Sequence, residues 1–143
     1  MNFEFFFSSN DNDNDKVRYG VKDLIKFACW NIRGFNSKII GKKFQSEDFL
    51  KEIRGSDVIG LIETHIHNSV LDDLAIPGYT LISYLNGKCN TKSHTAPGGL
   101  ALFCKESFSK YIVPVSSDNE DVIWIKIKKE TTGHDMDIYL GTL

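Results

Sequence analysis

Residues 27–34 read Phe-Ala-Cys-Trp-Asn-Ile-Arg-Gly, an apolar run that ends abruptly in a polar residue and a turn. The run begins near Leu24, and Lys26 is its one charged residue before Asn31. A nearly continuous apolar run is typical of a strand that is buried on both faces of a sheet. Asn31 is then the first residue to emerge from the sheet.

A second stretch has the same pattern, because the apolar residues 58–62 are followed directly by Glu63. Between the two runs the sequence predicts a helix that begins after the N-cap candidate Ser46 and ends at Gly55. A strand, a crossover helix and a second strand form a right-handed unit whose two strands are parallel. We therefore expect Asn31 and Glu63 to emerge at one edge of the sheet, where open α/β sheets bind their ligands.

The rest of the chain predicts mainly β-structure with short connections. Turn residues separate a set of apolar or alternating runs, which predict strands at 80–85, 99–105, 111–115, 122–128 and 137–143. A helical turn is expected within residues 68–75, and residues 86–98 form a long polar loop. The fold class is therefore α/β, with one mixed sheet and flanking helices.

Length and composition favour a single ordinary globular domain, with 143 residues of which 41% are hydrophobic and 25% charged. Residues 8–16 are a polar tract, so residues 1–21 are predicted to be a poorly ordered tail and residues 22–143 the domain. Three cysteines without a C-x-x-C pair suggest neither a disulfide framework nor a zinc site. The chain shows no secretory signal and no membrane span, so we expect an intracellular protein, with the nucleus left open as its location.

The charge of the chain neither selects nor excludes a substrate that contains phosphate. A formal net charge of −2 argues against a protein that holds nucleic acid by bulk positive charge. A local basic face around Lys38, Lys42 and Lys43 remains compatible with the sequence.

Three motifs, taken in order, resemble the endonuclease/exonuclease/phosphatase family. They are Cys-Trp-Asn-Ile-Arg-Gly at 29–34, Ile-Glu-Thr-His at 62–65 and Gly-Gly-Leu-Ala-Leu at 98–102. The pattern is most similar to the endonuclease domain of non-LTR (LINE-type) retrotransposon proteins. The resemblance runs from about residue 22 to residue 143 and covers only the N-terminal half of the family's domain. It implies half of a two-sheet α/β sandwich of the DNase I-like fold.

The resemblance also implies roles for two residues. In the family, the residue that corresponds to Glu63 binds a divalent metal, and the one that corresponds to Asn31 helps to hold the phosphate and the metal-site network. Mg²⁺, or Mn²⁺ in its place, suits such a site, because Mg²⁺ commonly takes one or two carboxylates, several waters and substrate phosphate oxygens. The implied function is metal-dependent hydrolysis of a phosphodiester, with DNA as the substrate. Without the resemblance, Glu63 would be read as a solvated carboxylate and Asn31 as a turn former.

Other polar residues near these motifs can be interpreted without a catalytic or metal-binding role. Arg33 stands where some apurinic-site endonucleases of the family have an acidic residue, which favours the retrotransposon branch. His65 and His67 are interpreted as solvent-facing loop residues rather than as a metal-binding pair. His94, with Lys88 and Lys92 in the same loop, could touch a nucleic-acid backbone, although a solvated loop explains it equally well. Core positions are expected for Cys29, Trp30 and Cys104.

Several parts of the family's active site have no counterpart in this sequence. The family has a tyrosine just after the strand predicted at 137–143, a later Asp-x-Asn pair and a Ser-Asp-His segment. Tyr139 lies inside that strand, and Ser117-Asp118-Asn119 lacks the histidine. Because acid–base assistance is worth about 10² to 10⁴ in rate, we expect the chain alone to be a very poor nuclease.

Two alternatives to a DNA endonuclease remain open at this point. One is a phosphatase of the same family that acts on a lipid or sugar phosphate. The other is a non-catalytic retroelement relic that is inert or only binds a partner. If the C-terminal half of the domain is missing, one sheet face is left uncovered, and self-association is then expected.

Overall fold

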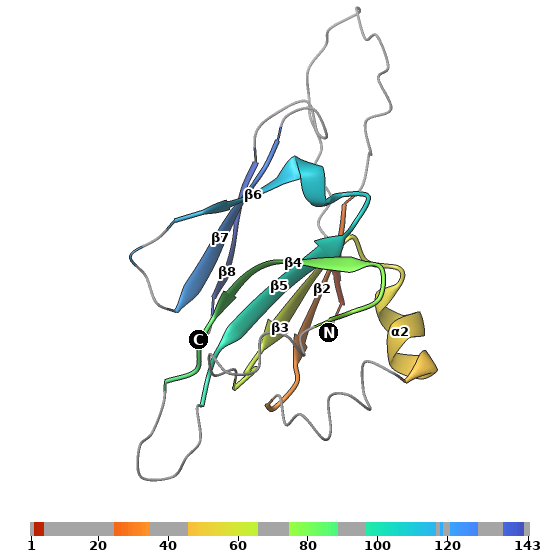
Figure 1. The fold of residues 1–143 in the computed structure, drawn as a ribbon, viewed down its shortest axis with the longest axis horizontal. Helices are drawn as coiled ribbons and strands as arrows, with labels where there is room; N and C mark the ends of the chain where they lie inside the picture. Colours follow the sequence, from red (N-terminus) through yellow and green to blue (C-terminus); the bar gives the residue numbers. More distant parts are fainter. Residues whose placement is uncertain are drawn as a thin grey trace, which may run out of the picture.

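The computed structural model describes residues 2–4, 25–34, 46–65, 75–88, 97–116, 118, 121–128 and 136–141. In these ranges the chain forms two β-sheets and one short α-helix (Figure 1). The larger sheet has the strand order β1-β2-β3-β5-β4, and the smaller has the order β6-β7-β8. The elements are β1 (Asn2–Glu4), β2 (Lys26–Asn31), α2 (Glu47–Ile53), β3 (Val58–Ile62), β4 (Tyr79–Leu85), β5 (Leu100–Lys105), the 3-10 helix η2 (Ser109–Tyr111), β6 (Ile112–Val115), β7 (Val122–Ile127) and β8 (Met136–Gly141).

The strand, helix and strand predicted around residues 27–62 form the centre of the larger sheet. Strands β2 and β3 are parallel neighbours, with Phe27 opposite Val58 and Asn31 opposite Ile62. Strand β5 pairs antiparallel with β3, β4 pairs antiparallel with β5, and β1 pairs antiparallel with β2. The sheet is therefore mixed, as expected. Strand β2 runs one residue further than predicted, so Asn31 ends the strand rather than following it.

Helix α2 is short, and only one of its faces is buried. Ser46 occupies the N-cap position, with an extended backbone, but its side chain makes no capping hydrogen bond. Leu50 and Ile53 are the buried residues of the helix, and Arg54 caps its C-terminus. The helix therefore owes its place to packing against the sheet more than to its N-cap.

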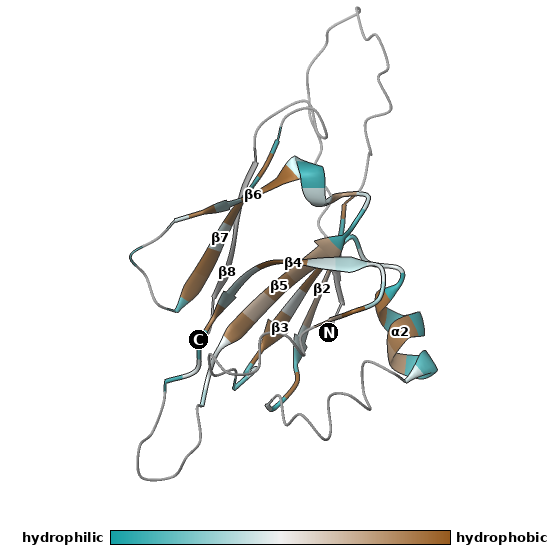
Figure 2. Ribbon diagram, in the orientation of Figure 1, coloured by the Kyte–Doolittle hydropathy of each residue, from teal (hydrophilic) through white to brown (hydrophobic). Residues whose placement is uncertain are grey.

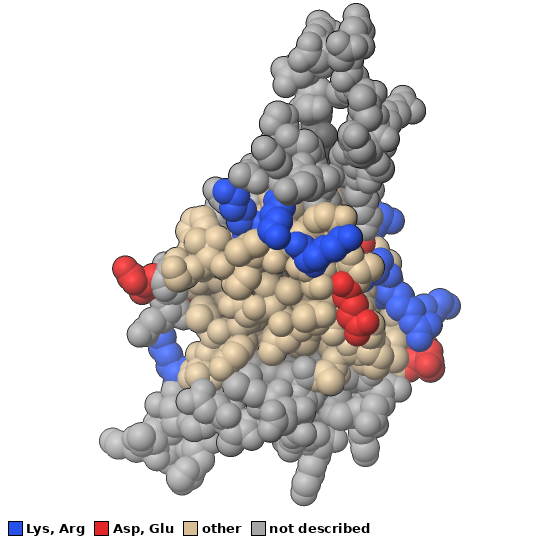
Figure 3. All heavy atoms as spheres, turned by 45° about the horizontal axis from the view of Figure 1, so that its top comes forward, with Lys and Arg blue, Asp and Glu red and all other residues tan. Residues whose placement is uncertain are grey.

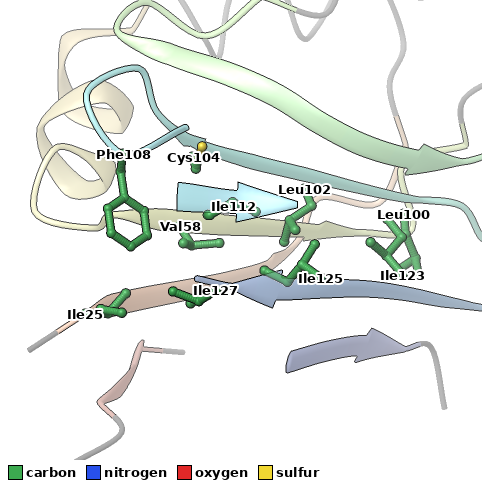
Figure 4. Packing of buried hydrophobic residues seen from close by; sticks show 10 residues of the cluster. All are labelled: Ile25, Val58, Leu100, Leu102, Cys104, Phe108, Ile112, Ile123, Ile125 and Ile127. Atoms are coloured by element: carbon green, nitrogen blue, oxygen red, sulfur yellow. The ribbon is translucent and has the colours of Figure 1, made fainter. Parts of the chain in front are cut away.

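The continuous apolar runs are explained by burial on both faces of the larger sheet. One face packs against α2, and its buried cluster is Ile32, Leu50, Ile53, Ile59, Leu61, Ile76, Tyr79, Ala101 and Phe103. The other face packs against β6 and β7 through Ile25, Val58, Leu100, Leu102, Cys104, Phe108, Ile112, Ile123, Ile125 and Ile127. In Figure 4 Ile123 of β7 lies beside Leu100, and Ile125 lies beside Leu102. Hydrophobic residues accordingly concentrate in β3, β5 and β7 (Figure 2).

The predicted α/β fold class is confirmed, and the smaller sheet adds one feature that was not expected. The sequence predicted one mixed sheet with an uncovered face, whereas strands β6 to β8 form a second sheet that covers this face. Strand β7 alternates buried and half-buried residues, so only one of its faces enters the core. The sheet face that was expected to be uncovered is therefore covered in the described residues, and self-association itself stays a prediction.

The predicted core positions are buried to different degrees. Cys104 is fully buried, and this burial raises the pKa of its thiol to about 11. Cys29 and Trp30 are only half-buried, and the Trp30 ring lies 5.5 Å from the Phe49 ring of α2. Cys104 belongs to the cluster packed between the two sheets, and it is the most enclosed of the three.

The N-terminal region contains a strand that the sequence analysis did not predict. Strand β1 pairs antiparallel with β2, with Phe3 opposite Phe27. Residues 5–24 lie outside the described ranges, so the tail at 1–21 and the domain boundary near 22 stay predictions. The helical turn expected within residues 68–75 and most of the loop at 86–98 also lie outside them.

The edge of the sheet away from Asn31 is closed by a buried carboxylate. Asp57 precedes β3 and is 1% exposed. Its Oδ2 accepts a hydrogen bond from the Lys26 N–H at 2.9 Å, and its Oδ1 lies 3.3 Å from Lys105 Nζ. The carboxylate thereby ties the start of β2 and the end of β5 to β3.

Basic residues also gather at this far edge. Lys26, Lys105 and Lys128 stand at strand ends away from Asn31, and Figure 3 shows Lys and Arg side chains along a rim of a largely uncharged surface. The basic face predicted around Lys38, Lys42 and Lys43 lies outside the described residues. Among the described helices, none is long and apolar enough to cross a membrane.

Candidate functional site

The candidate site lies at the carboxyl ends of β2 and β3, at the lower edge of the sheet in Figure 1. Asn31 ends β2 opposite Ile62, so Glu63 follows directly beyond its neighbour strand. The two segments that follow β2 and β3 stay hydrogen-bonded to each other. The Ile32 N–H donates to Ile62 O at 3.0 Å, and the Gly34 N–H donates to Glu63 O at 2.6 Å. The structure thus brings Asn31 and Glu63 to the same edge, as the parallel strand pair predicted.

The side chain of Asn31 is oriented by the turn that follows it. Its Oδ1 accepts a hydrogen bond from the Arg33 N–H at 3.0 Å. This hydrogen bond fixes the orientation of the Asn31 side-chain amide, because an N–H donor must face its oxygen and not its nitrogen. Asn31 is exposed, and its Nδ2 group remains as a hydrogen-bond donor at the sheet edge. A donor of this kind suits an anionic oxygen.

The backbone at this edge is strained. Arg33, Glu63 and His65 have φ values of +51°, +53° and +52°, and they are the only non-glycine residues in the described ranges with positive φ. Each residue in a sparsely populated backbone region costs about 1–3 kcal/mol, and such residues cluster at functional sites. All three lie just beyond the ends of β2 and β3, so the backbone geometry also makes this edge a candidate site.

A third strand holds the turn at Glu63 from the other side. The Thr64 N–H donates to Gly99 O at 3.2 Å, and the His65 N–H donates to Gly98 O at 2.8 Å. Gly98 and Gly99 directly precede β5, and both have positive φ. The motif at 98–102 therefore contributes backbone to the candidate site, which its sequence alone did not indicate.

Thr64 and Gly99 were not predicted to belong to the site. Thr64 is fully buried, and a Cβ added at Gly99 would lie 2.5 Å from its Oγ1. The available signal was the glycine pair next to a predicted strand, since an isolated glycine at such a place often marks a close approach of another group.

His65 corrects one expectation of the sequence analysis. Its ring is half-buried rather than solvent-facing, and its Nδ1 would lie 2.7 Å from a Cβ added at Gly34. The imidazole therefore rests on the turn that follows β2, next to the two predicted site residues. His67, His94 and Lys92 lie outside the described residues.

Lys88 is exposed and pairs with Asp121, with its Nζ 3.2 Å from Asp121 Oδ1. The pair links the start of the β4–β5 connection to the residue just before β7. An exposed pair of this type is worth about 0–1 kcal/mol. Lys88 is thus placed near the site edge with a carboxylate beside it, and its role toward nucleic acid stays a prediction.

The donor groups that the described residues place at this edge fit a loosely held hard cation. In the described part of the chain, no group of three or more His, Cys, Asp or Glu side chains could enclose a metal ion. Glu63 offers one carboxylate at the sheet edge where Asn31 ends its strand, and Mg²⁺ commonly binds to one or two protein carboxylates while it keeps water and phosphate ligands. The chemistry of these residues is therefore compatible with Mg²⁺ or Mn²⁺ and gives no support for zinc.

Comparison with known families gives one match. A family model described as the endonuclease/exonuclease/phosphatase family matches residues 28–134, which is more than half of the chain. The match begins within β2 and includes Asn31, Glu63 and the glycine pair at 98–99. A comparison with curated proteins found no match.

Proposed function

Because the chain belongs to the endonuclease/exonuclease/phosphatase family, we propose that it is a divalent-metal-dependent phosphodiesterase that acts on DNA. The observation that carries the proposal is the edge formed by Asn31 and Glu63, where the described left-handed non-glycine residues gather. We infer further that the activity is of the retrotransposon endonuclease type. Arg33 supports this inference, since a cation and not a carboxylate follows Asn31 in the turn.

Each residue of the edge has a distinct task in this proposal. The Glu63 carboxylate holds Mg²⁺ or Mn²⁺ together with water molecules. When bound, the metal supplies Lewis-acid polarisation of the phosphate and stabilises charge on the leaving oxygen. The Asn31 Nδ2 group donates a hydrogen bond to a phosphate oxygen, while its Oδ1 stays on the Arg33 N–H. The exposed Arg33 side chain adds positive charge where a phosphate backbone would approach.

The proposal also predicts how active the chain is when it is tested alone. Glu63 is the one carboxylate that the described residues place at the ends of β2 and β3, and no tyrosine accompanies it there. A group that activates water contributes about 10² to 10⁴ in rate. We therefore expect metal binding without efficient cleavage when this chain is tested alone.

Metal binding is tested first, because it does not depend on turnover. Mn²⁺ titrated into the protein should broaden the NMR signals near Asn31 and Glu63 at low affinity, and Glu63→Gln should remove this broadening. Glu106→Gln is the matched control, since Glu106 is an exposed glutamate just beyond β5 at the opposite edge. Equal broadening in wild type and Glu63→Gln would exclude Glu63 as a ligand.

Substrate and activity are tested with supercoiled plasmid and with a small phosphomonoester in Mg²⁺. The isolated chain should leave both substrates essentially uncut, and a fusion to the second half of a related endonuclease should nick plasmid in a manner that Glu63→Ala abolishes. Phosphomonoester hydrolysis without nicking would favour the phosphatase alternative. A folded fusion that binds Mn²⁺ through Glu63 but cleaves neither substrate would favour a non-catalytic relic.

A further inference from the structure

Thr64 lies between two left-handed residues. Glu63 and His65 on either side have positive φ, whereas Thr64 does not. A β-branched residue strongly resists positive φ, so Thr64 keeps an ordinary backbone in the middle of a strained turn. The direction in which the Glu63 side chain leaves the sheet therefore depends on how Thr64 is held.

Thr64 is held in place by its contacts with Gly99. The two residues share a backbone hydrogen bond of 3.2 Å, and the Thr64 side chain is fully buried. Thr64 Oγ1 lies so close to Gly99 that an added Cβ would come within 2.5 Å of it, and the same Cβ would come within 3.0 Å of Gly87 N. The side chain thus fills the space that the glycine leaves open.

Hydrogen bonding by the hydroxyl does not explain this position. Thr64 Oγ1 is buried and has no hydrogen-bond partner among the described residues. Leaving a buried polar group without a partner is unfavourable for folding. What the side chain provides at this point is therefore its branched shape.

From these contacts we propose that Thr64 is a positioning residue, which keeps Glu63 in its left-handed conformation by wedging its side chain against Gly99. The proposal rests on the role of Glu63 proposed above. Thr64 contacts neither metal nor substrate in this account. It acts through the backbone of its neighbour, and Gly99 is required because any side chain there would displace the wedge.

Four variants test the wedge. Thr64→Val keeps the branched shape and removes the hydroxyl, whereas Thr64→Ala removes the wedge. Gly99→Ala adds the Cβ that meets Oγ1, and Gly98→Ala is its matched control because Gly98 has a similar φ of +82° with nothing within 4 Å of an added Cβ. The two glycine variants therefore share the cost of a left-handed alanine and differ in the clash.

The first measurement reports the backbone and needs no metal. A residue with positive φ has a short distance between its own amide proton and Hα, which gives a strong intraresidue NOE. This NOE at Glu63 should persist in wild type, Thr64→Val and Gly98→Ala, and should weaken in Thr64→Ala and Gly99→Ala. Persistence in Thr64→Ala, or loss in Thr64→Val, would overturn the proposal. Dispersed amide spectra show that each variant is folded.

The second measurement is the Mn²⁺ titration used for Glu63→Gln. Thr64→Ala and Gly99→Ala should weaken Mn²⁺ binding by about tenfold, the factor expected when one left-handed residue is released. Thr64→Val and Gly98→Ala should stay within about twofold of wild type on the same scale. If the NOE weakens while Mn²⁺ binds equally to wild type and Glu63→Gln, the metal role of Glu63 fails and the wedge stands.

Discussion

At the scale of single residues, the backbone conformation distinguishes the candidate site more clearly than the chemistry of its side chains does. Glu63 has an ordinary carboxylate, but its backbone adopts φ +53°, which few glutamates do. The cost is offset by four backbone hydrogen bonds that lock the two turns to each other and to the residues before β5. Such locking would hold the carboxylate in one direction, as the metal role proposed for Glu63 requires.

The contact between His65 and Gly34 leads to a prediction at this scale. Gly34→Ala places a Cβ 2.7 Å from His65 Nδ1, so the ring must move away from the turn after β2. We expect the His65 imidazole signals to shift and the free energy of unfolding to fall by about 1–2 kcal/mol, the cost of a left-handed alanine. Two-dimensional NMR of the ring and urea denaturation measure the two effects.

Gly78→Ala is the control for Gly34→Ala. Gly78 has φ +81° and nothing within 4 Å of an added Cβ, so this variant carries the backbone cost without the contact. Its free energy of unfolding should fall by a similar amount, while the His65 ring signals stay in place. Unchanged ring signals in Gly34→Ala as well would show that the imidazole does not rest on Gly34.

At the scale of elements, the end of α2 is fastened to β4 by one hydroxyl. Tyr79 is buried, and its OH lies 2.6 Å from Ile53 O and 2.8 Å from Ser56 O, so its single proton is shared between these carbonyls. Burial, and secondarily the charge of Asp57, raises the pKa of Tyr79 to about 12. The neutral form of the tyrosine is therefore the one that stabilises the folded state.

This pKa predicts how stability changes at high pH. The tyrosine of the unfolded chain ionises near pH 10, and that of the folded chain near pH 12. The stabilisation is therefore complete below pH 10 and is lost between pH 10 and 12, by about 2–3 kcal/mol in total. Urea denaturation at pH 8, 10 and 11.5 measures it, and Tyr79→Phe should lose less stability over this range.

Tyr79→Phe also separates the hydrogen bond from the titration. At pH 8 it removes the hydroxyl donor from the carbonyls of Ile53 and Ser56, of which Ile53 O keeps its bond from the Ser56 N–H, and it should destabilise the protein by about 1–3 kcal/mol. Tyr84→Phe serves as the control, because Tyr84 is only half-buried in the same strand. An identical pH dependence in wild type and Tyr79→Phe would contradict the raised pKa.

At the scale of the whole molecule, the second sheet decides whether apolar surface reaches water. The inner face of β7 closes over β3 and β5, while the described large hydrophobic residues that remain exposed are Val113 at 38% and Val115 at 45% of β6. An uncovered sheet face would promote association between copies. Because the second sheet covers this face, an exposed sheet face is no longer a reason to expect association. Self-association of the wild type remains a separate proposal.

A pair of aspartate substitutions tests this coverage. Ile125→Asp buries a carboxylate between the sheets and should lower the free energy of unfolding by more than about 3 kcal/mol. Separation of the sheets should then expose the apolar face, which we expect to appear as dye binding and as larger species in sedimentation. Val113→Asp on the outer face should change stability by about 0.5 kcal/mol or less and leave sedimentation unchanged.

Either of two results would contradict the two-sheet core. One is that Ile125→Asp is as stable as wild type, and the other is that Val113→Asp is as destabilising as Ile125→Asp. The comparison is well matched, because both residues lie in the β6–β7 pair and differ mainly in which face of that sheet they occupy.

The local elements were predictable from the sequence, because their causes are local. Apolar runs at 27–30 and 58–62 with a helix between them required parallel strands, and this alone brought Asn31 and Glu63 to one edge. The later strands were predicted within one or two residues of their bounds, since turn residues and alternation mark each of them. The metal role of Glu63 came from the resemblance and remains a prediction.

The tertiary structure decided which distant residues meet. Whether β6 to β8 extend the first sheet or form a second one depends on packing across the whole core, and no short pattern encodes it. The His65 ring lies against Gly34, 31 positions away in the sequence, and the Thr64 side chain lies against Gly99, 35 positions away. The strained backbone at Glu63 is likewise held by partners outside its own segment, because local preferences alone favour right-handed or extended conformations there.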